Sequence, residues 1–169
     1  MNIEQVYIID TIELLEKMMH DNDYSYDVYF RMAVIEEHLK QNRKIWDLYN
    51  KMQTIRVSEV KFIPKEMQDH KKEFIELINS ISNNGYDFSQ PIIINNDFYV
   101  IDGAHRIACS LFFGIPQVSV IIQEEYKNHI PKEYTKEWFL EHHLGECVCY
   151  AEEQKKKTGE KACIKVKKF

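Results

Sequence analysis

The sequence predicts an α+β protein, and three of its features support that prediction. The 169 residues include only five glycines and four prolines, which disfavours a turn-rich sandwich and favours helices. Apolar side chains recur at helical spacing through most of the first fifty residues. Between residues 91 and 122, short apolar runs bounded by turn residues are typical of buried strands.

The first part of the chain, residues 1–53, is expected to be a helical N-terminal segment. Apolar residues repeat at helical spacing over residues 3–19, which predicts an amphipathic helix there. A second helix is expected over residues 26–39, and a third follows Asn42, a suitable N-cap, to about residue 52. The segment contains no catalytic motif, so its aromatic side chains are expected in the core or on a surface that docks a protein partner.

The residue pattern changes after Thr54, and residues 54–126 are expected to form the folded core. A β-like run predicts a strand over residues 56–63, and the apolar face of residues 66–82 predicts the helix that follows. Gly85 can take the left-handed conformation that ends such a helix. The remaining elements are two hairpin strands over 91–94 and 98–101, a helix over 102–113 and a buried strand over 118–122.

Residues 127–169 are expected to form a C-terminal helix followed by a basic tail. Two aromatic residues anchor a helix over 135–144, and the polar residues 151–161 are expected to form a solvated loop. Alternation over residues 162–166 would permit an edge strand. Lysines crowd this end, which is usual for a solvated surface and less often marks an acidic partner. The nearby histidines and cysteines fit no standard zinc spacing.

The composition excludes some classes of function. The net charge is −5 and the isoelectric point is about 5.8, whereas a protein that holds duplex DNA normally presents a basic face, so DNA is not an expected partner. Four unevenly placed cysteines do not suggest a disulfide scaffold. The chain shows no secretory signal, and no apolar run approaches the ~20 residues of a membrane span. A cytoplasmic protein that does not bind membranes is therefore expected.

The segment from Asp102 to Arg106 is the candidate functional site. It lies between a buried strand and a helix, whose first turn offers unpaired backbone N–H groups and a partial positive charge to an anion. Gly103 lets the backbone approach a ligand, and His105 and Arg106 supply donors that suit phosphate oxygens. The Asp102 carboxylate can hold Mg²⁺ or accept a proton from a hydroxyl group. The structural alternative is that Asp102 caps the helix while His105 and Arg106 pair with nearby acids.

The order of these features resembles the ParB/sulfiredoxin fold over about 65 residues, from Val57 to Ile122. The resemblance rests on Phe62-Ile63-Pro64, on the helix ending at Ile81, on Pro91-Ile92-Ile93-Ile94, on the run from Tyr99 to Arg106 and on Gly114-Ile115-Pro116. It implies that the backbone and side chains of Gly103, Ala104, His105 and Arg106 bind a nucleotide. Ser80 matches the hydroxyl residue that the family carries at the end of the preceding helix.

Local residues distinguish the branches of this family. Sulfiredoxins need a reactive Cys where this chain has Ala104, and they carry a Lys where it has Glu73. Partition-type ParB proteins have a more basic box and continue into a helix-turn-helix, which is not apparent after Ile122. Free-serine kinases resemble the chain better, because their Asp-Gly-x-His-Arg box is matched from Asp102 to Arg106. Glu66 is the nearest match to their other catalytic carboxylate.

The resemblance therefore implies a nucleotide-dependent phosphotransferase that uses ATP or ADP with Mg²⁺ and acts on a small hydroxyl compound. Similar small proteins with helical N-termini look like accessories of surface-polysaccharide pathways, which suggests an amino acid or a sugar as the acceptor. Asp102 would serve as base or Mg²⁺ carboxylate, with Glu66 and His105 as further catalytic candidates. Two alternatives stay open: a non-catalytic nucleotide-binding regulator or adaptor and, third, a ParB-like DNA-binding protein.

Overall fold

A computed structural model describes residues 4–19, 26–59 and 67–167 of the chain, and it confirms the α+β class. One mixed sheet has the strand order β1-β4-β2-β3, in which β4 pairs antiparallel with β1 and parallel with β2, and β2 pairs antiparallel with β3. The strands are β1 Val6–Asp10, β2 Ile92–Ile94, β3 Val100–Asp102 and β4 Gln117–Ile122.

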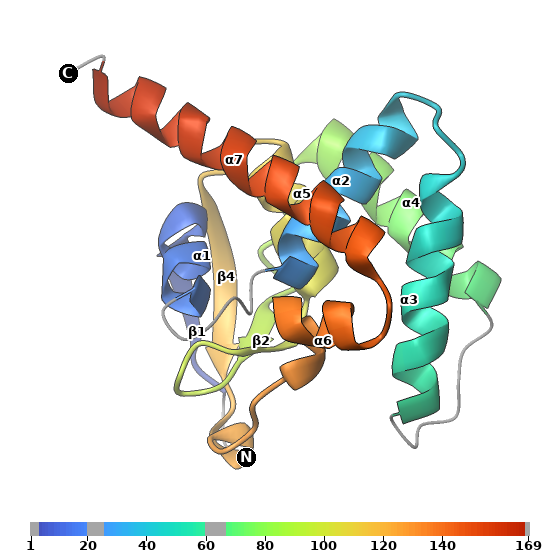
Figure 1. The fold of residues 1–169 in the computed structure, drawn as a ribbon. Helices are drawn as coiled ribbons and strands as arrows, with labels where there is room; N and C mark the ends of the chain where they lie inside the picture. Colours follow the sequence, from blue (N-terminus) through green and yellow to red (C-terminus); the bar gives the residue numbers. More distant parts are fainter. Residues whose placement is uncertain (1–3, 20–25, 60–66, 168–169) are drawn as a thin grey trace.

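Helices surround the sheet and form most of the molecule (Figure 1). They are α1 Thr11–Met19, α2 Tyr26–Leu39, α3 Ile45–Glu59, α4 Met67–Asn84, α5 Ala104–Phe112, α6 Lys136–Glu141 and α7 Gly145–Lys167, with short 3₁₀ turns at Glu124–Tyr126 and Lys132–Tyr134. The central helix is α2, whose residues 26–35 are all buried and which packs against α5 and α7. A helix that is buried on every side belongs to the interior of a core.

The predicted helix over residues 3–19 is wrong in its first half. Residues 6–10 form the edge strand β1, in which Tyr7 pairs with Val120 and Ile9 with Val118. The consecutive β-branched and aromatic residues of this stretch favour an extended chain, and the sheet supplies the hydrogen bonds. Asp10 then starts α1, because its Oδ1 accepts hydrogen bonds from the backbone N–H groups of Ile12 and Glu13 at 2.9 and 3.1 Å.

The predicted strand over residues 56–63 is wrong for residues 56–59, which continue α3; the rest of it lies outside the described residues. The buried residues of α3 recur at helical spacing and end in a charged one: Ile45, Trp46, Tyr49, Met52, Gln53 and Arg56. Because Arg56 occupies a core position, the apolar pattern in the sequence stops one turn before the helix does.

The expected solvated loop over 151–161 and edge strand over 162–166 are also wrong, because both lie in α7. The helix expected over 135–144 ends earlier, at Glu141, where His142 and the left-handed His143 (φ 57°) turn the chain into α7. In the stretch of α7 after Ala151 whose side chains are described, residues 152–159, no residue is apolar, so the hydrophobic pattern does not reveal that the helix continues.

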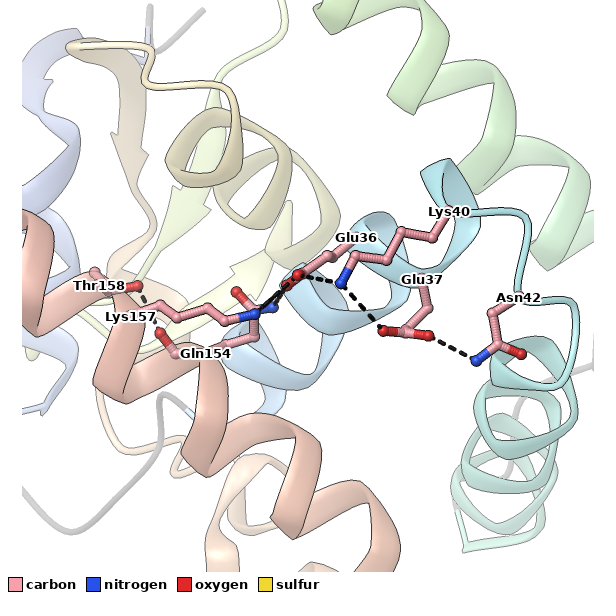
Figure 2. Close-up of polar contacts among 7 residues, drawn as sticks. All are labelled: Glu36, Glu37, Lys40, Asn42, Gln154, Lys157 and Thr158. Carbon is pink, nitrogen blue, oxygen red and sulfur yellow. Dashed lines mark hydrogen bonds and ion pairs between the residues drawn. The ribbon is translucent and has the colours of Figure 1, made fainter.

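Polar contacts hold the middle of α7 against the end of α2 (Figure 2). Glu36 accepts hydrogen bonds from Lys157 Nζ at 2.8 and 3.0 Å and from Lys40 Nζ at 2.7 Å, and the side-chain amide of Gln154 also donates to it. Burial alone would raise the pKa of Glu36, but these donors lower it to about 2. The carboxylate of Glu36 therefore links two helices that lie 118 to 121 residues apart in sequence.

A Glu36→Gln variant is expected to lose stability in a pH-dependent way. The folded protein lowers the pKa of Glu36 from its ordinary 4.5 to about 2, so the carboxylate stabilises the fold above pH 4.5 and loses this effect as the pH falls toward 2. The parent protein should therefore exceed the variant in stability by about 1–2 kcal/mol at pH 7, and the gap should close below pH 4.5. Thermal unfolding followed by circular dichroism from pH 2 to pH 7 measures it. A gap that does not depend on pH would contradict the assignment, and Glu76→Gln, in an exposed pair with Lys72, is the control.

The central elements agree with the sequence predictions. α4 follows the expected helix closely and stops at Gly85, which has φ 78° and donates its N–H to the Ile81 carbonyl at 2.9 Å. The hairpin of β2 and β3, the helix α5 and the strand β4 also lie where the sequence predicts them. Among the described residues, no helix combines the length and the apolar content that crossing a membrane requires.

Candidate functional site

The turn from β3 into α5 forms one wall of the site. Gly103 lies between the last residue of the strand and the first residue of the helix, in a left-handed conformation with φ 107°. A Cβ atom at this position would lie 3.0 Å from Arg106 Nη2 and 3.1 Å from Ile92 Cγ1. The left-handed backbone conformation therefore requires glycine here, and a Cβ atom would also crowd Ile92 and the guanidinium group.

The N-terminus of α5 has free donors. Gly103 is the N-cap, and within the described part of the chain no side chain makes a capping hydrogen bond. The first intrahelical bond runs from the Ile107 N–H to the Gly103 carbonyl at 3.0 Å, so the N–H groups of residues 104–106 precede the helical ladder. Together they place a partial positive charge at this end of the helix, where an anion is favoured. Ala104 contributes its backbone, since its side chain is buried in the core.

A cavity of about 240 Å³ opens between this turn and α4. Its lining residues are His70, Glu73, Phe74 and Leu77 from α4, with Asp102, Gly103, His105 and Arg106 opposite. A neighbouring hollow of about 180 Å³ shares Leu77 and Arg106 with this cavity and is lined by Ser80. The structure thus brings together Asp102, Gly103, His105 and Arg106, and it places Ser80 next to them, whereas Glu66 lies outside the described residues.

Asp102 and Arg106 form an ion pair at the mouth of the cavity, with 3.2 Å between Oδ2 and Nη2. The Asp102 side chain is 69% exposed, so water screens this contact and makes it weak. The Arg106 side chain is only 19% exposed, and its Nε is buried without a hydrogen-bond acceptor among the described residues. Asp102 does not cap α5, so that part of the structural alternative is wrong, but Arg106 does pair with a nearby acid.

His105 sits deeper than its neighbours in the turn. Its Nε2 lies 2.8 Å from the Tyr49 hydroxyl, and its ring centroid lies 4.5 Å from that of Phe74. Burial, followed by the positive charges of Arg31 and Arg56, lowers the pKa of His105 well below its ordinary value. His105 is therefore neutral at physiological pH and can contribute a hydrogen bond to this site without adding a charge.

Sequence reasoning missed the contribution of α4. Its amphipathic pattern predicts a buried face, but not that Phe74 and Leu77 would lie opposite the turn of Asp102. Glu73 stands where sulfiredoxins carry a Lys, and it lines the same cavity as Asp102. Two carboxylates and the phosphates of a nucleotide would together supply the oxygen ligands that Mg²⁺ prefers. Within the described residues, no group of three or more His, Cys, Asp and Glu side chains is placed to hold a metal ion alone.

The C-terminal histidines and cysteines have other surroundings. His142 stacks on Trp138, with 4.4 Å between ring centroids, and its Nε2 contacts the Glu59 carboxylate at the end of α3. Cys147 is buried and Cys149 is exposed. These contacts join α6 to α3 and are structural.

The model of one protein family, the ParB N-terminal domain, matches residues 36–133, which is more than half of the chain. The match includes both walls of the cavity, from α4 to α5, and Tyr49 behind them. Searches of curated proteins and of solved structures gave no significant match. The chain therefore belongs to the ParB N-terminal domain family, within the ParB/sulfiredoxin-like superfamily.

Proposed function

We propose that the protein is a nucleotide-dependent phosphotransferase that transfers phosphate from ATP or ADP, with Mg²⁺, to a small hydroxyl compound such as an amino acid or a sugar. The observation that supports it best is the content of one cavity: the N-terminus of α5, the Arg106 guanidinium and the carboxylates of Asp102 and Glu73. The resemblance to free-serine kinases in the Asp-Gly-x-His-Arg box agrees with this proposal.

The nucleotide phosphates would lie against the turn of Gly103. The N–H groups of residues 104–106 would donate to phosphate oxygens, and Arg106 would add a charged and bidentate donor. A phosphate has more charge than a carboxylate and three acceptor oxygens, so it would replace the exposed Asp102 as the partner of Arg106. Ser80, in the adjoining hollow, would extend this surface with a hydroxyl group.

Release of Asp102 from Arg106 would leave its carboxylate beside the bound phosphates. There it could bind Mg²⁺ or accept the proton of the attacking hydroxyl group, with Glu73 as a second carboxylate in the same cavity. Glu66 remains the further carboxylate that the resemblance implies. The acceptor oxygen would form a bond to the terminal phosphorus, the bond to the bridging oxygen would break, and the shortened nucleotide would leave with that electron pair. Phosphoryl transfer needs mainly positioning and charge neutralisation, which these few groups can provide.

An Arg106→Ala variant tests the nucleotide site. Loss of a charge-assisted contact worth about 1.5–3 kcal/mol should weaken nucleotide binding about 10- to 150-fold. Calorimetry with ATP, ADP and CTP in the presence of Mg²⁺ measures the change. Arg43→Ala is the matched control, because Arg43 lines a separate hollow with Trp46 and Lys71. Failure of all three nucleotides to bind the parent protein at millimolar concentration would overturn the assignment of the site.

A further inference from the structure

We propose that Tyr49 of α3 is a positioning residue for this site. Its hydroxyl group holds the His105 imidazole in the tautomer that carries its proton on Nδ1. The structure gives Tyr49 a direct contact to the site from a different helix, since its hydroxyl oxygen lies 2.8 Å from His105 Nε2. The identity of the ligand that His105 binds rests on the proposed function, whereas the assignment of the tautomer does not. Tyr49 thereby leaves the neutral His105 imidazole with a single donor, the Nδ1–H group, at the wall of the proposed nucleotide cavity.

The direction of the hydrogen bond follows from the second partner of Tyr49. The side-chain nitrogen of Gln53, which can only donate, lies 3.0 Å from the Tyr49 hydroxyl oxygen. The phenol oxygen accepts this bond, and among the described residues the other polar atom within hydrogen-bond distance of it is His105 Nε2, so the phenol hydrogen is directed there. Burial raises the pKa of Tyr49, which keeps that hydrogen on the phenol. His105 Nε2 is therefore an acceptor, and the ring proton resides on Nδ1.

The surroundings keep His105 uncharged, which the tautomer requires. The charged and titratable groups around it include Arg31 of α2, Arg56 of α3, His70 of α4 and Arg106 of its own helix, and all four disfavour a second proton on the ring. A protonated imidazole would make the phenol oxygen accept a second hydrogen bond beside that of Gln53, and the phenol hydrogen would then lose its acceptor at Nε2. Tyr49 is thus matched to a neutral ring.

Packing against two aromatic rings fixes the orientation of the His105 imidazole. Phe74 meets His105 edge to face at 67°, and the ring of Tyr49 does so at 65° from 6.1 Å. A rotated imidazole would present carbon instead of Nε2 to the phenol and leave a buried hydroxyl group with an unmade bond. Among the described residues no side chain bonds to Nδ1, and His105 lines the cavity, so the Nδ1–H group is the donor left for a phosphate oxygen.

Nitrogen-15 NMR of histidine-labelled protein tests the tautomer without any ligand. The parent protein should show Nδ1 as the protonated nitrogen of His105 and Nε2 as the unprotonated one, unchanged from pH 5 to pH 8. In the Tyr49→Phe variant, His105 Nε2 no longer accepts a hydrogen bond from a phenol, so the tautomer protonated on Nε2 should appear as a second species. Tyr26→Phe is the matched control, since it removes a buried phenol that donates to Glu152 instead. A proton on Nε2 in the parent protein would overturn the proposal, even where the variant does not fold.

Nucleotide affinity separates this inference from the proposed function. If Nδ1–H donates to a phosphate, Tyr49→Phe should weaken ATP or ADP binding about two- to tenfold, and Tyr26→Phe should leave it unchanged. Unchanged affinity in Tyr49→Phe together with a changed tautomer would overturn the positioning role. A parent protein with the expected tautomer but no nucleotide binding would refute the proposed function and leave the tautomer assignment supported.

Discussion

An Asp27→Asn variant is expected to be about 3–5 kcal/mol less stable than the parent protein, because it would leave two buried cations without their anion. Asp27 is fully buried and pairs with Arg31, four residues along α2, and with Arg56 of α3. The contact to Arg56 is an ion pair at 2.5 Å, from Nη1 to Oδ1, without the geometry of a hydrogen bond. Burial lowers the pKa of both arginines to about 10, so both remain charged at neutral pH.

The surroundings of Arg56 prevent its guanidinium group from reaching water when the Asp27 carboxylate is removed. Its Nη2 donates to the Glu133 carbonyl at 2.7 Å, and its guanidinium lies 4.9 Å from the centre of the Trp138 ring. It cannot move into water without releasing α6. Urea unfolding measures the difference, with Glu13→Gln as the control: Glu13 and Lys17 form the same i,i+4 pair at 3.9 Å on an exposed surface, where the loss should stay below about 1 kcal/mol. Equal losses in the two variants would contradict the importance of burial.

An Asp102→Asn variant is expected to lose about 10²- to 10⁴-fold in the rate of phosphoryl transfer. Asn keeps the size of Asp but neither accepts a proton nor binds Mg²⁺ strongly. Because the Asp102 side chain is 69% exposed and caps nothing, the fold should be unaffected. Nucleotide affinity should change less than the rate, because the donors proposed to bind the phosphates lie at Gly103 and beyond. Phosphorus NMR with ATP or ADP and a panel of amino acids and sugars measures the transfer.

Asp97→Asn is the matched control, since Asp97 is an exposed carboxylate in the turn between β2 and β3, outside the cavity. Equal turnover in the Asp102→Asn variant and the parent protein would remove Asp102 from the mechanism. Tight nucleotide binding with no turnover for any acceptor would instead favour a non-catalytic regulator or adaptor.

The sequence predicts the middle of the molecule better than its ends, for physical reasons. From α4 to β4, each element is strongly patterned, and turn residues such as Gly85 and Gly114 follow the helices, so local signals suffice. β1 has no such signal of its own and depends on pairing with β4, more than 100 residues away. The end of α3 and the middle of α7 rest on polar or charged side chains, Arg56 in α3 and Gln154 with Lys157 in α7. These occupy positions where a pattern search expects apolar residues.

The sequence likewise predicts one part of the candidate site and not the other. The turn from Asp102 to Arg106 is contiguous in sequence, so its residue types alone indicate an anion site. Glu73 and Tyr49 come from other helices, and only the packing of α3 and α4 brings them to His105. No spacing rule connects residues 49, 73 and 105, because the distances between them depend on how three helices cross.

The burial of α2 on all sides also determines the stage of protein synthesis at which a stable fold can form. On a ribosome, α2 emerges more than 70 residues before α5 and more than 110 before α7, the two helices that cover it (Figure 1). Until then only α3, which follows α2 directly, can pack on it. Most of the apolar surface of α2 stays uncovered, and the nascent chain must hold it in a loose or chaperone-bound state. The first strand likewise waits for β4 before it gains a partner. Folding therefore depends on contacts of long sequence separation around α2 and β1, which slow it for a protein so rich in helix. The segment 36–133 that matches the family contains only the last turn of α2 and neither β1 nor α7, so in this chain the matched core relies on packing and pairing with residues outside it.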